Sequence, residues 1–194
     1  MKILPLALFA LLGSTPGAFA AAIAFSSALA TYDQGGNYDI AKSVNGNILD
    51  GLGWGVFDGQ FVDETAVFAT SAPFSASTIA VGMSQFFGFN HHIQNFRLSI
   101  TSDPSPSLAG NWTQLAPSQV LVAGGPTAMI AAGNTVAVSG TSANLYGGLT
   151  GYRVVASGTF TDVTGVRLET FPNDYDPSDG LARLWVARRT AILC

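Results

Sequence analysis

The sequence predicts an all-β fold of sandwich or barrel type, and three observations support that prediction. Residues 94–101 alternate apolar and polar side chains, and residues 163–170 repeat the alternation; a period of two is typical of a strand with one buried and one wetter face. Short apolar pieces separated by glycine-rich turns follow between residues 119 and 156, a spacing typical of sandwiches and barrels. No stretch after residue 20 sustains a helical period. The inward positions are Phe96, Leu98, Ile100, Val166 and Leu168, with Arg167 and Glu169 facing outward.

The composition agrees with this fold class and argues against several functions. Charged residues make up only 10% of the 194 residues, against about 25% in average domains, and 22 residues are glycine. A disordered chain would carry more charge and fewer aromatic side chains. The eight Lys and Arg form no stripe, so nucleic-acid binding is not expected. Because Cys194 is the single cysteine, an intrachain disulfide and a thiolate metal cluster are both excluded.

The first 20 residues have the pattern of a signal peptide. Lys2 precedes an apolar run over residues 3–12, a breaker-rich stretch follows, and residues 18–20 form a small-x-small cleavage site. The alternative is a membrane anchor, but the apolar run is shorter than the about 20 residues that a span needs. We therefore expect cleavage near Ala20, a secreted protein without a membrane span, and one domain over residues 21–194.

Taken in order, the rest of the chain divides into short strands and turns. Residues 21–30 lead into a first strand, and residues 31–37 are rich in turn formers. Residues 45–47 have a turn sequence, Asn-Gly-Asn, in which glycine supplies a positive φ. Four glycines surround Trp54 in a tight loop. Further strands are expected over residues 64–70, 78–84, 119–123, 127–131, 135–139 and 152–156.

The order of these features resembles the discoidin domain, also called the coagulation factor five/eight C-type domain, of the galactose-binding-like superfamily. Residues 38–47 followed by Trp54 are similar to the opening motif of that family, with Asn45 in place of its usual aspartate. Residues 96–103 followed by Asn111-Trp112 are similar to its central motif, and residues 163–169 to a strand near its end. A variant within large secreted bacterial proteins is the most similar, through residues 53–56, 66–68 and 92–101. The resemblance covers most of residues 30–193.

The sequence departs from the family in two places. The family closes with a strand that pairs near the N-terminal one, whereas residues 184–194 match that motif poorly. The closing strand is therefore expected to be altered or truncated, which would leave an open sheet edge. Many members also carry disulfides that link their ends, and this chain cannot.

The resemblance implies an eight-stranded, jelly-roll-like antiparallel β-sandwich whose loops at one end bind ligands. The ligands are sugars in many members and phospholipid headgroups or proteins in others. Trp54 could stack on a pyranose ring or close the glycine-rich loop on the core edge, and the family favours packing. Trp112 follows a turn and is also interpreted as packing. The adjacent His91 and His92 make a poor chelate because strand neighbours face opposite ways. The candidate ligand-binding residues are Trp54, Asn90, His91, Trp112 and Tyr175.

Two oxygen-rich stretches are candidates for the structural calcium that is frequent in the family. Hard oxygen ligands suit calcium, but the spacing is not that of an EF-hand, and solvated polar turns are the alternative. The candidate ligands are Asn45, Asn47 and Asp50 in one stretch and Asn173, Asp174, Asp176 and Asp179 in the other.

No catalytic motif stands out in the sequence, which contains no nucleophile elbow, zinc-protease motif or phosphate loop. The leading hypothesis is a secreted, non-catalytic binding module for glycan or another extracellular surface component. The alternatives are a structural or adhesion domain that contacts a surface protein and, with less support, an accessory domain of a carbohydrate-active enzyme. The oligomeric state is left open.

Overall fold

The computed structural model describes residues 21–45, 52–55, 62–85, 93–140, 150–171, 185–186 and 191–193. The part of the chain so described is built of strands and three short 3₁₀-helices, without an α-helix. The strands are β1 (Ala22–Ile23), β2 (Phe25–Ala30), β3 (Trp54–Gly55), β4 (Glu64–Gln85), β5 (Asn95–Thr101), β6 (Thr113–Gln114), β7 (Pro117–Ala123), β8 (Thr127–Ile130), β9 (Val136–Ser139), β10 (Thr150–Phe171), β11 (Trp185–Val186) and β12 (Ala191–Leu193). The 3₁₀-helices are η1 (Gly36–Tyr38), η2 (Ile40–Val44) and η3 (Ala132–Asn134).

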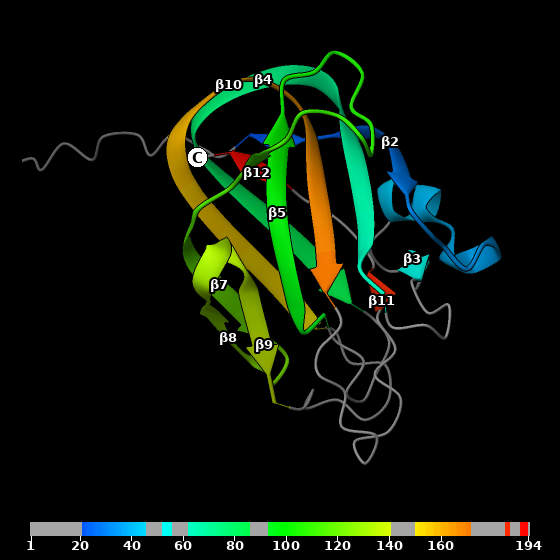
Figure 1. Ribbon diagram of the computed structural model, residues 1–194, viewed down its shortest axis with the longest axis vertical. Coiled ribbons are helices and arrows are strands. Elements are labelled where there is room, and N and C mark those ends of the chain that lie inside the picture. Colours follow the sequence, from blue (N-terminus) through cyan, green and yellow to red (C-terminus); the bar gives the residue numbers. More distant parts are fainter. Residues whose placement is uncertain are drawn as a thin grey trace, which may run out of the picture.

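The strands form a two-layered antiparallel sandwich, which confirms the predicted fold class (Figure 1). One layer contains β2, the first half of β4, the second half of β10, β5 and the short strands beside β5. The other layer contains β1, β12, the second half of β4, the first half of β10 and β7. The two layers therefore share β4 and β10.

The sequence pattern predicted two separate strands in place of each of these long strands, and that prediction is wrong. β4 and β10 run for 22 residues each and pair with one another over nearly their whole length. The pairing register shifts in the middle, between Ser157 and Gly165. Both strands bend there and pass from one layer to the other, as Figure 1 shows at the top of the molecule. Strands that change sheets do so through bulges or bends of this kind.

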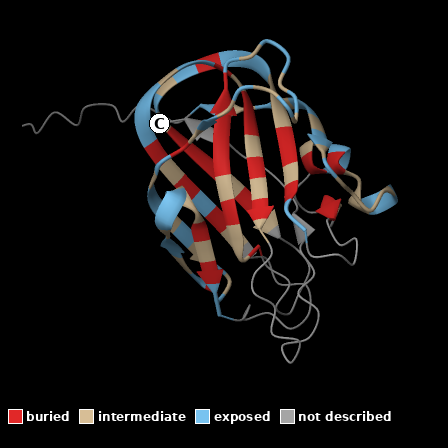
Figure 2. Ribbon diagram, viewed as in Figure 1, coloured by how far each residue is buried: buried red, intermediate tan, exposed pale blue. Residues whose placement is uncertain are grey.

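The predicted alternation is confirmed in the core between the layers (Figure 2). Phe96 is 0% exposed and Leu168 is 1% exposed, and the other inward positions of β5 and β10 are buried with them. The ring of Tyr152 packs edge-on against Phe96 with 5.9 Å between centroids. Its hydroxyl oxygen accepts a hydrogen bond from the backbone N–H of Ile93 at 3.1 Å, and burial raises the pKa of Tyr152 far above its ordinary value.

A strand near the C-terminus pairs with the N-terminal strand. Ala22 lies opposite Ile192, and β12 also pairs with β4. The poor match of residues 184–194 to the closing motif predicted an altered closing strand and an open edge here. Three residues suffice to place β12 between β1 and β4, because the backbone ladder that joins these strands needs no particular side chains.

Candidate functional site

The two tryptophan candidates differ in how far the fold buries them. Trp54 is 0% exposed, so neither face of its indole can stack on a ligand. Its Nε1–H donates to the carbonyl oxygen of Tyr32 at 2.7 Å. The backbone N–H of Gln34 donates to Gly55 O at 3.1 Å. Trp54 therefore ties residues 31–45 to the sandwich, and its candidacy as a ligand-binding residue is withdrawn in favour of packing.

Most of the other candidates lie outside the described residues. This holds for the ligand-binding candidates Asn90, His91 and Tyr175 and for the calcium candidates Asn47, Asp50, Asn173, Asp174, Asp176 and Asp179. Asn45 is described; it is exposed and follows η2. Within the described ranges, no group of three His, Cys, Asp or Glu side chains could hold a metal ion.

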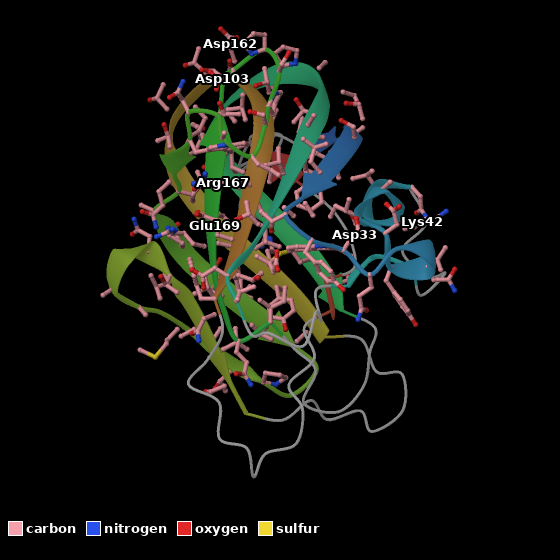
Figure 3. All side chains as sticks on the ribbon, turned by 45° about the vertical axis from the view of Figure 1, so that its right-hand side comes forward. Asp33, Lys42, Asp103, Asp162, Arg167 and Glu169 are labelled. Carbon is pink, nitrogen blue, oxygen red and sulfur yellow. The ribbon has the colours of Figure 1, made fainter. Side chains whose placement is uncertain are left out.

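Two acidic side chains in residues 31–45 accept hydrogen bonds from the nearby backbone; one of them, Asp33, is labelled in Figure 3. The carboxylate of Asp33 accepts from Gly35 N at 2.9 Å and from Ile40 N at 3.5 Å. Asp39 caps η2 by accepting from Ala41 N at 2.8 Å. A short acidic side chain at this position satisfies an amide that the helix leaves unpaired, so both carboxylates are accounted for by the fold.

Trp112 lies at the end of a loop that folds back against the sheet. Its indole N–H donates to Ser107 O at 3.1 Å, and Asn111 N donates to Asp103 Oδ2 at 2.9 Å. The hydroxyl of Thr164, in β10, donates to Asp103 O at 2.5 Å. These bonds fix residues 103–112 against β10 and leave Trp112 partly exposed.

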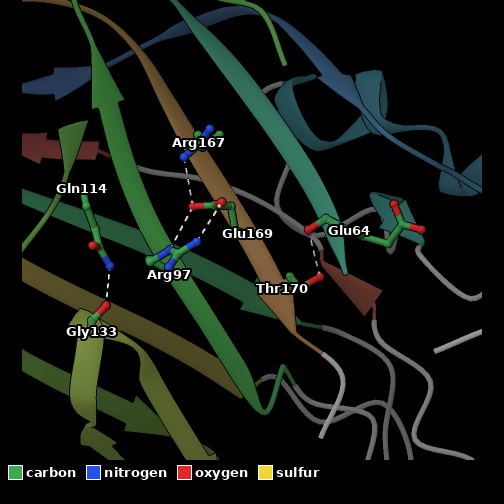
Figure 4. A network of polar contacts seen from close by, with 7 residues as sticks. All are labelled: Glu64, Arg97, Gln114, Gly133, Arg167, Glu169 and Thr170. Carbon is green, nitrogen blue, oxygen red and sulfur yellow. Dashed lines mark hydrogen bonds and ion pairs between the residues drawn. The ribbon is translucent and has the colours of Figure 1, made fainter. Parts of the chain in front are cut away.

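Beside Trp112, three charged side chains from β5 and β10 form one network (Figure 4). Arg97 grips the Glu169 carboxylate with two bonds, Nε to Oε2 at 3.1 Å and Nη2 to Oε1 at 3.0 Å. Arg167 adds Nη2 to Oε2 at 3.2 Å. The pairing register explains the contact, because Arg97 lies directly opposite Glu169 and strand residues two apart share a face.

Aromatic rings flank both guanidinium groups. The Arg167 guanidinium carbon lies 5.1 Å from the Trp112 ring centroid, and that of Arg97 lies 5.0 Å from the Phe171 ring centroid. Cations within about 6 Å of an aromatic centroid are attracted to the ring face. We call this surface the Arg–Trp face; it consists of Arg97, Trp112, Arg167, Glu169 and Phe171. The side chain of Gln114, on β6 beside β5, donates to Gly133 O.

The network also sets the protonation of its members. Burial alone would raise the pKa of Glu169, but the hydrogen bond from Arg97 and the positive charges of Arg167 and Arg97 hold that pKa below its ordinary value. The hydrogen bond to Glu169 raises the pKa of Arg97, against the opposing effect of burial. Glu169 and Arg97 are therefore both charged at neutral pH.

The alternation of residues 163–170 places Arg167 and Glu169 on the outer side of their strand but does not bring them together with Arg97 and Trp112. The signal available in the sequence was the opposite charge of Arg97 and Glu169, on two strands that share a period of two. Using that signal requires the pairing register between residues 72 positions apart, which no local pattern contains.

Comparisons with known proteins concern the fold. No family model matches the chain, and no curated protein sequence matches it. The Clostridium perfringens module CpGH89CBM32-5, solved in complex with GalNAc-β-1,3-galactose, is similar in structure, with a TM-score of 0.50 and 12% identity over 87% of this chain and 94% of that chain. The fold is discoidin-like.

A second solved structure is also similar over most of its length. It is chitosan-binding module 1 from a chitosanase/glucanase of Paenibacillus sp. IK-5, with a TM-score of 0.48 and 9% identity over 88% of this chain and 96% of that chain. At sequence identities this low, the similarity shows only a shared fold. Among the residues with described positions, no helix is long and apolar enough to cross a membrane.

Proposed function

We propose that this discoidin-like chain is a secreted, non-catalytic module that binds glycan. The observation that carries the proposal is the Arg–Trp face, where a partly exposed indole lies beside charged hydrogen-bonding groups on a rigid sheet. Indole faces suit the C–H faces of sugar rings, and polar groups fixed beside an apolar surface orient a ligand. The fold is shared with a module solved with a bound disaccharide. The signal-peptide pattern of residues 1–20 agrees with export.

A glycan array followed by calorimetry tests the proposal. We expect retention on a subset of glycans and loss of that retention in Trp112→Ala. Leu121→Ala is the matched control, because it removes another exposed apolar side chain, on β7 in the other layer. No binding to any glycan at millimolar concentration, with a folded protein, would refute the proposal. An accessory role beside a carbohydrate-active enzyme would rest on the same binding activity.

A specific observation favours the adhesion alternative. Three large apolar side chains are exposed on β7 and β8, and Met129 is 64% exposed. Exposed apolar side chains such as these could contact another protein. The residues are Leu121, Met129 and Ile130. If this surface carries the function, the unaltered chain should bind a surface protein and no glycan. Met129→Ser should abolish the binding to that protein.

Structural calcium is proposed separately. The family resemblance motivates it, together with oxygen-rich side chains at Asn45 and at six positions outside the described residues. Because a ligand that binds only the native state stabilises it, we expect the melting temperature to rise with added calcium and fall with a chelator. Magnesium at the same concentration is the control. A melting temperature that changes neither with added calcium nor with a chelator would rule out a structural calcium ion.

A further inference from the structure

The hydrogen-bonding capacity left on the Arg–Trp face is almost entirely that of a donor. A guanidinium has five N–H donors and no acceptor, while a carboxylate only accepts. Glu169 Oε2 already accepts from both arginines, and Oε1 accepts from Arg97. Three N–H groups of the two guanidiniums therefore already occupy most of the acceptor capacity of Glu169. The described residues provide no further acceptor for the remaining N–H groups.

Arg167 shows this imbalance most clearly. Its Nε–H is buried and has no hydrogen-bond partner, although buried polar groups are nearly always paired. Its guanidinium lies over Trp112 and gives one hydrogen bond to Glu169. A purely structural arginine at a buried site would be expected to have more of its donors paired. The side chain remains 20% exposed, so part of it can be reached from solvent.

Among the residues that the structure describes, the surrounding carboxylates do not neutralise the Arg167 end of the face. Two guanidiniums share the one carboxylate of Glu169. The charge of Asp63 acts on Arg97, whose pKa it helps to raise. Asp103, the acidic residue in the loop before Trp112, directs its carboxylate to Asn111 N. The surplus of donors and of positive charge is therefore concentrated next to the indole.

We propose that the Arg–Trp face binds an acidic saccharide, with the anionic oxygens accepting from Arg167 and the sugar ring lying against Trp112. The inference rests on the proposed glycan-binding function and specifies its ligand class. A neutral sugar offers hydroxyls that need donors and acceptors in balance, and this face has few acceptors left. A carboxylate or a sulfate ester offers acceptors alone, and guanidinium pairs with either through short, charge-assisted bonds.

The chain as a whole would not attract such a ligand. Its net charge is −4, so long-range electrostatics oppose the approach of a polyanion. Retention of an acidic saccharide would therefore depend on local donors. Variants that change the net charge equally can therefore separate a local effect of Arg167 from an effect of overall charge.

The test compares saccharides that differ only in their anionic groups. Dextran sulfate is paired with dextran, and polygalacturonate with its methyl ester. Binding is measured by calorimetry for the unaltered chain, Arg167→Gln and Arg153→Gln. Arg153 is an exposed arginine in the first half of β10, in the other layer, so its substitution changes the net charge equally. We expect the acidic member of at least one pair to bind, and Arg167→Gln to weaken it by about tenfold or more, as for loss of a charged hydrogen bond.

A second measurement keeps the proposal falsifiable if Arg167→Gln unfolds. In the unaltered chain, nuclear magnetic resonance follows the arginine Nε–H signals during titration with the acidic saccharide. The Arg167 signal should shift and the Arg153 signal should not. The sulfate pair and the uronate pair distinguish which anionic group is preferred.

The outcomes separate this inference from the proposed function. Binding to neutral members alone would overturn the acidic ligand and leave glycan binding intact. Equal loss in Arg167→Gln and Arg153→Gln, or shifts of both signals, would indicate bulk charge and overturn the site. No binding to any saccharide would overturn both proposals.

Discussion

Two tryptophans that each follow a turn-forming stretch are buried to different extents, and their hydrogen bonds explain the difference. Trp54 follows a glycine-rich stretch, and its indole N–H donates to Tyr32 O in a segment that covers it. The N–H of Trp112 instead donates to Ser107 O within its own loop, so the ring lies on the sheet face and is not enclosed. A tryptophan N–H finds a partner when buried, and the position of that partner decides which ring is covered.

This difference predicts unequal costs of truncation. Trp54→Ala should lower the free energy of unfolding by about 3–5 kcal/mol, because it removes a fully buried ring and leaves a cavity. Trp112→Ala should cost roughly 1 kcal/mol or less, as for a partly exposed position. Urea denaturation of the two variants measures both. Equal costs would contradict the burial described for Trp54.

The Glu169 network predicts a pH dependence of stability. The folded-state pKa of Glu169 is below its ordinary value of 4.5, so the unfolded chain takes up a proton more readily. The stabilisation by ionised Glu169 is therefore complete above the ordinary pKa and is lost as the pH falls through the lower, folded-state pKa. The advantage of the unaltered chain over Glu169→Gln should shrink as the pH falls from about 6 through the ordinary pKa of 4.5 and below it.

Thermal melting of both proteins across that range measures the effect. The control is Glu169→Gln itself, whose remaining acid sensitivity comes from other carboxylates. A difference between the two proteins that stays constant with pH would mean that Glu169 is not stabilised by its arginines.

At the scale of residues, the sequence predicted which side of its strand each residue faces but not which side chains it contacts. Phe96, Leu98 and Leu168 were expected inside and are buried, since a period of two determines the face directly. The ion pair between Arg97 and Glu169 depends on the pairing of β5 with β10. A shift of one residue would put each on the other face, and nothing local to either strand excludes that shift.

At the scale of elements, the bends of β4 and β10 account for the error in counting strands. Pro73 and the small residues around it resemble a break between two strands. In β10, Gly158 and Asp162, with a φ of +49°, lie where the register shifts. Residues of this kind end a strand in a hairpin but also form bulges within one. The sequence pattern is the same in both cases, so the distinction required the partner strand.

The contact between Gly165 and the Trp112 loop predicts a second-site effect on the face. A Cβ at Gly165 would lie 2.8 Å from Pro106 Cγ and 3.2 Å from Thr101 Cγ2. Gly165→Ala should therefore push the loop away and destabilise the protein by about 1–3 kcal/mol, as overpacking does. The indole N–H signal of Trp112 should shift at the same time.

Gly151→Ala is the matched control, because it lies in the same strand and its Cβ would meet Ala123 Cβ at an ordinary 4.0 Å. We expect its free energy of unfolding to stay within about 0.5 kcal/mol of the unaltered chain. If Gly165→Ala is as well tolerated as Gly151→Ala, then Pro106 does not pack on β10 as described.

For the whole molecule, the sharing of β4 and β10 makes the two layers one structural unit. The sequence predicted an antiparallel sandwich from periodicity, and the fold confirms it. The sequence pattern could not show that β4 and β10 each contribute one half to one layer and the other half to the other layer. That property comes from long-range pairing, such as Val154 with Val81 in one layer and Leu168 with Ala66 in the other.

This arrangement predicts that neither layer can open without the other. β10 is flanked on both sides in each layer, by β4 and β7 around Val154 and by β4 and β5 around Leu168. Backbone amides near both residues should therefore exchange with solvent only through global unfolding, at the same free energy of about 5–15 kcal/mol and with the same denaturant dependence. Edge strand β8 serves as the control and should exchange through local opening, since it ends the sheet. Native-state hydrogen exchange resolves these cases, and a lower free energy in one half of β10 would show that the two layers unfold separately.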